Sequence, residues 1–319
     1  MTAMLAVDGG QTCFRIALVQ RGRPVRDAVL PGFGYQTSNN GSFGAITVAL
    51  IEAFALIGAP KEIARICLGL SGAPAKQDAR RQLATSLSQQ FSGAEVWLGP
   101  DMVTAHAGAL SGEPGVVVAA GTGVVCLGLG LEGRVRRADG LGHIFGDEGS
   151  GFSIGRAAIR AAFRGLEGRG PKTSLTEAAS RFFVGLDDLP ERIQLSTNPV
   201  RDVAGFAPEV AREAAEGDPT AQQIWDEAVD HLVRTAMAVV RGTFPAASPR
   251  SVPVSYVGGL FASAELLLTP FRRRLMELCE AADCREPQGD ALAGAVWLLS
   301  KGPGRYAQLL EMTGAGNHE

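Results

Sequence analysis

The sequence predicts an α/β protein made of two related halves with a cleft between them. Apolar runs that suit strands alternate with stretches that suit helices, and 319 residues is long enough for two domains. A pattern of strand, glycine loop, strand and glycine turn also occurs twice at one offset of 111 residues, which pairs Gly10 with Gly121 and Gly22 with Gly133. Because the order of elements recurs together with the glycines, we interpret the chain as a duplicated α/β unit.

The first half alternates between strands and helices. Residues 4–7 form an apolar run, and in the next run Phe14, Ile16 and Leu18 alternate with other residues, which is typical of a half-buried strand. The further elements expected in this half are strands at 25–30, 66–70 and 95–98 and helices at 44–56, 76–90 and 102–110.

The second half begins with the same pattern and then becomes mostly helical. The uncharged stretch 114–131 falls short of the ~20 residues of a membrane span and is broken by glycines at its middle, so two strands around a glycine turn fit it better. The elements expected here are strands at 116–120, 124–131 and 254–257, a mostly helical stretch at 155–241 that includes helices at 207–216 and 220–241, and helices at 264–281 and 290–299.

Composition and charge exclude several classes of protein. Apolar residues make up 46% of the chain and charged residues 20%, which rules out wholesale disorder. A net charge of -3 argues against a general nucleic-acid binder and against a polybasic membrane binder. The five cysteines form no C-x-x-C motif and no secretory signal is visible, so we expect reduced thiols in a cytoplasmic protein.

The segment Asp8-Gly9-Gly10-Gln11-Thr12 is the first motif that could carry chemistry. Its glycines join strand to strand, whereas the glycines of a Rossmann or P-loop motif open a helix. Free backbone N–H groups at such a hairpin tip could hold a phosphate, with Asp8 binding Mg²⁺ through water and Thr12 donating its hydroxyl. A tight hairpin without a ligand is the alternative, and the motif alone slightly favours it.

The second glycine tip and one acidic residue add to this picture. If the halves are related, the tip at Gly121–Gly123 faces the same cleft as the first and can hold a polyphosphate from the other side; the alternative is again a plain hairpin turn. Asp101 follows a strand and precedes a helix. Position alone favours a helix N-cap, while a general base at the carboxyl end of a strand is the functional interpretation, and one residue can fill both roles.

A glycine-rich loop at 140–151 contains Asp147 and Glu148 ahead of a helix. These acids are either first-turn charges of that helix or hydrogen-bond acceptors for a polyhydroxyl ligand, and the density of glycine favours a ligand loop. His143 in the same loop suits a packed or hydrogen-bonded role better than a catalytic one. The polar loop at 32–40 fits either a solvated turn or amides that reach a sugar hydroxyl.

Taken together, these motifs resemble the actin-like ATPase superfamily of sugar kinases, heat-shock ATPases and actin. Within it, the chain looks like the N-acetylglucosamine and glucosamine kinase branch of the BadF/BadG/BcrA/BcrD family. The resemblance spans nearly the whole chain and rests on the joint order of its pieces. Those pieces are the phosphate loops at 8–12 and 120–123, the base Asp101, the sugar-side loop at 142–150, and the adenosine-side elements at 217–219 and 258–259.

The resemblance implies a two-lobed, ribonuclease H-like α/β fold with duplicated domains and a central nucleotide cleft. The N-terminal lobe would be 1–111, joined by the C-terminal helix at 294–319, and the C-terminal lobe 112–293. The implied activity is that of an ATP-dependent hexosamine kinase that uses Mg²⁺. It would transfer the γ-phosphate to a hydroxyl of N-acetylglucosamine or glucosamine, with C6 as the expected position, and we expect a homodimer.

The roles of the family's residues carry over by position. Asp101 would take the proton from the attacking sugar hydroxyl, and Asp8 would hold Mg²⁺ through water. The expected nucleotide-binding residues are Gly9, Gly10, Gln11, Thr12, Gly121, Thr122, Gly123, Ala214, Gly258, Gly259 and Ser263. The expected sugar-binding residues are Asn39, Gly142, His143 and Asp147.

Three positions depart from the pattern of this branch. Val124 stands where Ser usually follows G-T-G, Leu141 stands where an aromatic is frequent, and Pro100 precedes Asp101 where Thr, Ser or Asn is usual. These departures preserve the ATP motifs and leave the sugar open among N-acetylglucosamine, glucosamine, N-acetylmuramic acid and N-acetylmannosamine.

Two other functions compete with the kinase. An ATP-driven activator of a dehydratase, from the same family, typically has Cys just before A-A-G-T-G, and this chain has Val118 there. A sugar-binding regulator without catalysis is disfavoured because Asp8, Thr12 and Asp101 are all present.

Overall fold

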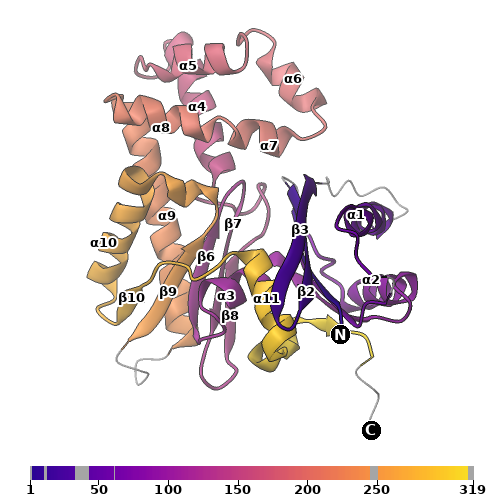
Figure 1. The fold of residues 1–319 in the computed structure, drawn as a ribbon. Helices are drawn as coiled ribbons and strands as arrows, with labels where there is room; N and C mark the ends of the chain where they lie inside the picture. Colours follow the sequence, from indigo (N-terminus) through magenta and orange to yellow (C-terminus); the bar gives the residue numbers. More distant parts are fainter. Residues whose placement is uncertain (1, 11–12, 33–42, 61, 245–250, 315–319) are drawn as a thin grey trace. The chain divides into compact units, whose positions relative to one another are not determined.

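The chain forms two compact units, each with its own β-sheet and its own buried apolar core (Figure 1). Unit 1 comprises Met1–Pro114 and Glu286–Glu319, and unit 2 comprises Gly115–Arg285. The computed structural model describes residues 2–10, 13–32, 43–60, 62–244 and 251–314. Three candidate site residues, Gln11, Thr12 and Asn39, lie outside the described residues.

The sheet of unit 1 combines an antiparallel meander with parallel strands. In the order β11-β5-β4-β1-β2-β3, strands β1, β2 and β3 are antiparallel neighbours, β4 and β5 run parallel to β1, and β11 is antiparallel to β5. The strands are β1 (Met4–Gly9), β2 (Cys13–Gln20), β3 (Arg23–Pro31), β4 (Arg65–Leu70), β5 (Glu95–Pro100) and β11 (Glu311–Met312).

Helices cover both faces of this sheet. Helices α1 (Phe43–Leu56) and α2 (Gln77–Gln90) share the apolar core of unit 1 with alternate residues of β1. Helices α3 (Asp101–Ala109) and α11 (Ala291–Lys301) pack against each other and against β1 and β4. A 3₁₀ segment, η3 (Gly304–Leu309), connects α11 to β11. The β1 residues that alternate with the core positions, including Asp8, therefore face α3 and α11.

The sheet of unit 2 repeats the plan of unit 1. In the order β10-β9-β6-β7-β8, strands β6, β7 and β8 are antiparallel neighbours, and β9 and β10 extend the sheet in parallel from β6. The strands are β6 (Gly115–Ala120), β7 (Val124–Leu129), β8 (Val135–Asp139), β9 (Val252–Val257) and β10 (Ala282–Cys284).

Between β8 and β9 the chain is helical, as the pattern at 155–241 predicts. The helices are α4 (Gly151–Leu166), α5 (Leu175–Phe182), α6 (Leu189–Leu195), α7 (Pro199–Ala204), α8 (Ala207–Ala215) and α9 (Pro219–Thr243). After β9 come the short segments η1 (Gly259–Ala262) and η2 (Ala264–Leu268), followed by α10 (Thr269–Leu278). Within the described ranges, none of the helices is both long and apolar enough to cross a membrane.

The two sheets confirm the predicted duplication. Strands β3-β2-β1-β4-β5 and β8-β7-β6-β9-β10 share one order and one set of directions. The turn glycines matched at the sequence offset, Gly22 and Gly133, both have φ of 73°, a conformation that favours glycine. The copies differ at the first turn, because Gly9 pairs with Phe14 while Ala120 pairs with Val124. The first turn of unit 2 is therefore one residue shorter, so the offset is 110 between Phe14 and Val124 and is 111 again between Gly22 and Gly133.

Helices α3 and α11 approach so closely that their contact requires glycine. A Cβ on Gly108 would overlap the carbonyl oxygen of Asp290, and a Cβ on Gly294 would overlap that of Thr104. In α3, every residue from Met102 to Ala109 is buried. This packing fixes α3, and with it the position of Asp101 at its first turn.

We predict that Gly294→Ala lowers the free energy of unfolding by ~1–3 kcal/mol, because the added Cβ forces α11 away from the backbone of α3. The control is Gly44→Ala in α1, where an added Cβ meets nothing within 4 Å. That change should be neutral or stabilise by ~0.5–1 kcal/mol through helix propensity. Denaturant unfolding of both variants checks this, and equal stabilities would contradict the close crossing.

Candidate functional site

The hairpin tip of unit 1 starts where β1 ends. The Gly10 N–H donates to the carbonyl oxygen of Cys13 at 2.9 Å, which closes the tip. A Cβ on Gly9 would lie 2.6 Å from the Leu70 side chain, so Gly9 serves packing. At Gly10 an added Cβ would find only ordinary contacts, at 3.4 Å from Cys13 and 3.6 Å from Ser71. The backbone at Gly10 is therefore the more open of the two.

Asp8 lies next to this tip and is paired with Arg15. The two residues are partners across β1 and β2, and both Nε and Nη2 of Arg15 donate to Asp8 Oδ2, at 3.0 and 2.5 Å. Burial raises the pKa of Asp8 above its ordinary value, although Arg15 acts in the opposite direction. The Asp8 side chain is 15% exposed, and Asp101 is close enough to contribute to the raised pKa.

The surroundings of Asp8 fit a Mg²⁺ ion that arrives with a nucleotide. In the described part of the chain, no group of three or more His, Cys, Asp or Glu side chains could hold a metal by itself. Mg²⁺ bound to a nucleotide needs only one or two carboxylates, since phosphates and water supply its other ligands. A single, partly exposed carboxylate beside an open glycine matches that need.

Asp101 is the first residue of α3, directly after β5. The structure corrects the expectation that it is the N-cap, because Pro100 occupies that position. The Oδ1 atom of Asp101 accepts a hydrogen bond from the Met102 N–H at 2.8 Å, and Oδ2 accepts one from the Ser71 hydroxyl. Its carboxylate is thus held by two donors while the residue stays partly exposed.

Ser71 connects these elements and was missed by the sequence analysis. Its N–H donates to the Gly9 carbonyl oxygen at 2.8 Å, and its hydroxyl donates to Asp101. Ser71 follows β4, the strand between β1 and β5. Its position could have been found from the sequence, because Ser71 directly follows a predicted parallel strand. The carboxyl ends of such strands meet at one edge of the sheet, where site residues gather.

The glycine tip of unit 2 is joined to the start of α4. The Gly121 N–H donates to the Gly123 carbonyl oxygen at 2.9 Å, and the carbonyls of Gly121 and Thr122 accept from the N–H groups of Gly151 and Phe152 at 2.8 and 3.2 Å. An added Cβ on Gly121 would meet nothing within 4 Å. Gly121 is therefore the open glycine of this tip, as Gly10 is in unit 1.

Asp147 lies directly against the same tip. Its Oδ1 accepts the Val124 N–H at 2.9 Å, and its own N–H donates to Asp139 at 2.9 Å. A Cβ on Gly123 would lie 2.7 Å from Oδ1. Asp147 is only 8% exposed, and burial raises its pKa. The structure thus brings together the predicted sugar-side acid and the second phosphate loop within unit 2.

The rest of the loop predicted to bind the sugar forms a tight turn. The Gly142 carbonyl accepts from the N–H groups of Phe145 and Gly146, at 3.2 and 2.8 Å. The ring of His143 packs edge-on against Phe152 with centroids 5.1 Å apart, which agrees with the packed role expected for it. Glu148 is exposed and lies 3.3 Å from Nδ1 of His231.

The glycines predicted to lie on the adenosine side follow β9. Gly258 has a φ of 106°, and a Cβ there would overlap the carbonyl oxygen of Ala120, the last residue of β6. Gly259 is exposed, and a Cβ there would meet nothing within 4 Å. Ser263 is partly exposed at the end of η1. Gly258 therefore places Gly259 beside the end of the strand that carries the second tip.

Ala214 differs from these exposed residues. Its side chain is 2% exposed and belongs to the apolar core of unit 2. Its carbonyl accepts hydrogen bonds from Gly217 and from the Gln222 side chain, at 3.2 and 3.1 Å. A nucleoside contact through the Ala214 methyl group would require a change in core packing.

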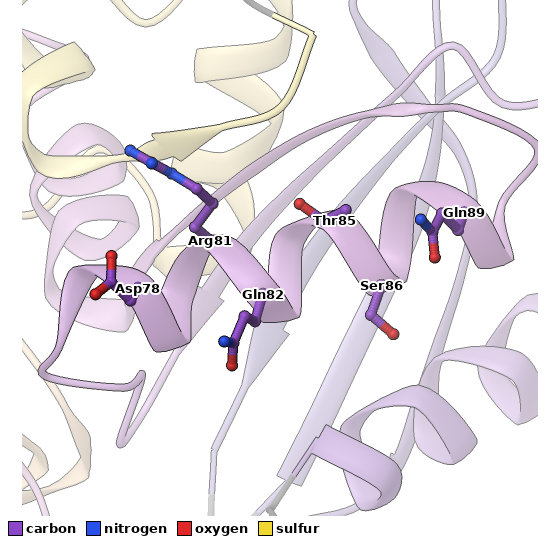
Figure 2. A pocket seen from close by; sticks show the side chains of 6 residues that line it. All are labelled: Asp78, Arg81, Gln82, Thr85, Ser86 and Gln89. Atoms are coloured by element: carbon purple, nitrogen blue, oxygen red, sulfur yellow. The ribbon is translucent and has the colours of Figure 1, made fainter.

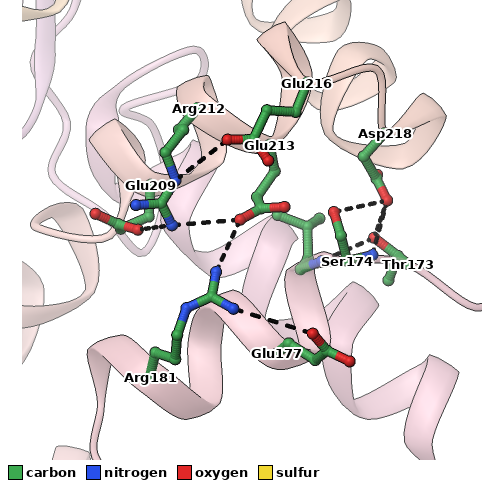
Figure 3. A network of polar contacts seen from close by, with 10 residues as sticks. Thr173, Ser174, Glu177, Arg181, Glu209, Arg212, Glu213, Glu216 and Asp218 are labelled. Carbon is green, nitrogen blue, oxygen red and sulfur yellow. Dashed lines mark hydrogen bonds and ion pairs between the residues drawn. The ribbon is translucent and has the colours of Figure 1, made fainter.

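Polar contacts fix the helices around Ala214 (Figure 3). Glu213 is buried and accepts from Arg181 and Arg212 at 3.1 and 3.3 Å. Asp218 caps α9 through the Ala221 N–H at 2.8 Å and also accepts from Thr173 and Ser174. Partial burial alone would raise the pKa of Asp218, but these hydrogen bonds hold it below its ordinary value.

A surface hollow on α2 contains none of the predicted site residues (Figure 2). All of its lining side chains project from this one helix, and one of them, Arg81, pairs with Glu311 at 3.1 Å. The lining residues are Asp78, Arg81, Gln82, Thr85, Ser86 and Gln89.

Comparisons with known proteins agree with this arrangement. The model of the BadF/BadG/BcrA/BcrD ATPase family matches residues 5–298, so the chain belongs to this family. It is 32% identical over 218 residues to an N-acetylmuramic acid/N-acetylglucosamine kinase of Clostridium acetobutylicum, covering 67% of this chain and 70% of that protein. It is 27% identical over 252 residues to an N-acetyl-D-glucosamine kinase of Dictyostelium discoideum, covering 74% and 75%.

Solved structures give the same picture for the fold. A candidate N-acetylglucosamine kinase from Chromobacterium violaceum matches with a TM-score of 0.74 and 31% identity, covering 94% of this chain and 99% of that one. A ROK family glucokinase from Streptomyces griseus, solved with glucose and AMPPNP, matches with a TM-score of 0.55 and 18% identity, covering 92% and 97%. The second likeness shows a shared fold only. The predicted two-lobed actin-like class of fold is thereby confirmed.

We predict that Gly258→Ala destabilises the protein by ~1–3 kcal/mol, because its Cβ meets the Ala120 carbonyl and its φ disfavours a side chain. Gly259→Ala is the matched neighbour, with open space around it, and should leave the melting temperature within about a degree. Thermal unfolding of the two variants checks this. A Gly258→Ala variant as stable as Gly259→Ala would refute the close contact with β6.

Proposed function

We propose that this chain is an ATP-dependent amino-sugar kinase that transfers the γ-phosphate to C6 of N-acetylglucosamine or glucosamine. The observation that carries the proposal is the link in unit 1 from Gly9 through Ser71 to Asp101. It places a hydrogen-bonded carboxylate at the first turn of a helix and next to a glycine tip that has room for a ligand. Curated relatives named as amino-sugar kinases support the same reaction.

In this mechanism, Asp101 acts as the general base. Its carboxylate takes the proton of the sugar hydroxyl while the hydroxyl oxygen attacks the γ-phosphorus, and the bond from that phosphorus to the β–γ bridging oxygen breaks to release ADP. The hydrogen bonds from Ser71 and from the Met102 N–H hold the carboxylate in one orientation. Such positioning is most of what phosphoryl transfer requires of a protein.

The glycine tips would supply the nucleotide-binding groups. The N–H groups of Gly10 and Gly121 already donate within their own hairpins, to Cys13 and Gly123, so phosphate oxygens would accept from other N–H groups of each tip. The absence of side chains at Gly10 and Gly121 leaves room for those oxygens. Asp8 would hold Mg²⁺ through water, and the ion would neutralise phosphate charge when bound. Thr12 and Thr122 would donate their hydroxyls, and Gly259 and Ser263 would contact the nucleoside.

Residues of the loop that carries Asp147 would bind the sugar. Asp147 Oδ1 accepts the Val124 N–H and lies close to Gly123. Asp147 Oδ2 accepts no hydrogen bond from the described residues. Oδ2 can therefore accept from a sugar hydroxyl. Asn39 and the turn at Gly142–His143 would complete the set.

The homodimeric state and the cytoplasmic location of the protein stay predictions. The competing role as a dehydratase activator has no support from the thiols around the second tip. Val118 stands at the position where such proteins have Cys, and Cys126 is buried with its pKa raised by burial.

The reaction is tested by measuring ATP consumption with a panel of amino sugars, namely N-acetylglucosamine, glucosamine, N-acetylmuramic acid and N-acetylmannosamine, with glucose as the control that lacks nitrogen. We expect turnover with N-acetylglucosamine or glucosamine and a 6-phosphate product by NMR. A product phosphorylated elsewhere would contradict the C6 assignment. Sugar binding without any turnover would favour a non-catalytic regulator.

We predict that Asp101→Asn lowers kcat by ~100- to 10,000-fold, because the amide cannot accept the proton. The melting temperature and the affinities for ATP and sugar should stay near wild type, since the amide oxygen can still accept from the Met102 N–H. The control is Asp78→Asn, an acid in the first turn of α2 that should leave kcat unchanged. Near-normal kcat in Asp101→Asn would move the base elsewhere, with Asp147 the next residue to test.

A further inference from the structure

Arg15 occupies a central place among the acids of unit 1. Its Nε and Nη2 atoms donate to Asp8, and its Nη1 atom donates to Oδ2 of Asp290 at 2.5 Å. The side chains of Arg15 and Asp8 are 26% and 15% exposed, so water screens this pair only partly, whereas the Asp290 side chain is 54% exposed. One guanidinium group thus joins the first glycine hairpin to the start of α11.

The geometry at Asp8 is asymmetric. Both hydrogen bonds from Arg15 converge on Oδ2, and no described residue donates to Oδ1. The rigid, planar guanidinium group therefore fixes the plane of the carboxylate and leaves Oδ1 as its accepting atom. A lysine ammonium, as a single point charge, cannot impose this orientation while it also reaches Asp290.

The two acidic residues that Arg15 contacts have different structural roles. Asp290 is the N-cap of α11, and its Oδ1 accepts the Ala293 N–H at 2.9 Å. That cap does not depend on Arg15, because Oδ1 makes it while Oδ2 receives the guanidinium. Asp8 has no such backbone partner among the described residues, and of these residues Arg15 is the one that donates hydrogen bonds to its carboxylate.

We propose that Arg15 is a positioning residue that holds Asp8 ready for nucleotide-bound Mg²⁺, with Oδ1 directed away from the ion pair to receive a water ligand of the metal. The inference rests on the proposed function and adds Arg15, which lies outside the motifs identified in the sequence. Partners that orient a metal's ligands are worth ~10–100-fold in metal affinity when removed, which sets the size of the expected effect.

The test measures ATP affinity by isothermal titration calorimetry, once with excess Mg²⁺ and once with EDTA. The ratio of the two dissociation constants is the magnesium increment. Arg15→Met should reduce this increment by ~10–100-fold while the affinity in EDTA changes less than about twofold. A residue with a purely structural role would weaken both affinities together, because it would disturb the hairpin whether or not the metal is present.

Two further variants keep the test decisive. Asp290→Asn removes the second ion pair but keeps a residue that caps helices as well as Asp does, so its magnesium increment should match wild type. Arg15→Lys retains the charge for folding, and its increment should still fall because the ammonium cannot orient Asp8. If Arg15→Met does not fold, Arg15→Lys decides the question.

The outcomes separate this inference from the proposed function. A wild-type increment retained by Arg15→Met or Arg15→Lys overturns the role of Arg15 alone. Equal losses in Arg15→Met and Asp290→Asn would also overturn it, since Arg15 would then act through α11. A wild-type chain whose ATP binding does not respond to Mg²⁺ overturns the kinase function and this inference together.

Discussion

Close backbone contact at glycine is the constraint on which the candidate site depends. Gly108 and Gly294 let α11 press against α3, which fixes the turn that begins with Asp101. Gly258 brings the end of β9 against β6, and Gly123 leaves room for the carboxylate of Asp147. A methyl group at any of these four positions would displace an element or loop that carries a candidate site residue. The glycine content of the chain is thus partly a packing requirement, separate from the need for open backbone at Gly10 and Gly121.

The central hairpins were predictable because their pattern is local and strong. Apolar strands that end in glycine, repeated at one offset, identified both tips and the duplication. The edge strand β8 was missed because its sequence, VRRAD, has no apolar alternation: Arg136 and Arg137 are exposed, and Ala138 is only partly buried against the core. Strands β10 and β11 are three and two residues long, too short to leave a pattern. Their pairing is decided by neighbours distant in the sequence.

The site shows the same division between local and distant information. Asp8, Asp101 and Asp147 were identified from the glycines and strand ends around them. Ser71 and Arg15 were not, because each matters through a partner that only the folded sheet brings near, Asp101 in one case and Asp8 with Asp290 in the other. The departures at Val124 and Leu141 also look different in the structure. Val124 contributes its N–H to Asp147 whatever its side chain, and Leu141 is 65% exposed.

Unit 1 is built from two stretches of chain separated by the whole of unit 2, and this has a consequence for biosynthesis. Helix α11, which completes one face of the first sheet and provides Asp290 for Arg15, is translated after Arg285. The nascent chain therefore exposes the buried side of α3 throughout synthesis of the second unit, which can close its own core first. An intermediate that still lacks Glu286–Glu319, and with it α11, η3 and β11, is therefore expected to bind chaperones. Until α11 has been translated, Asp101 lies on an incompletely packed helix, so the candidate site cannot form before that helix.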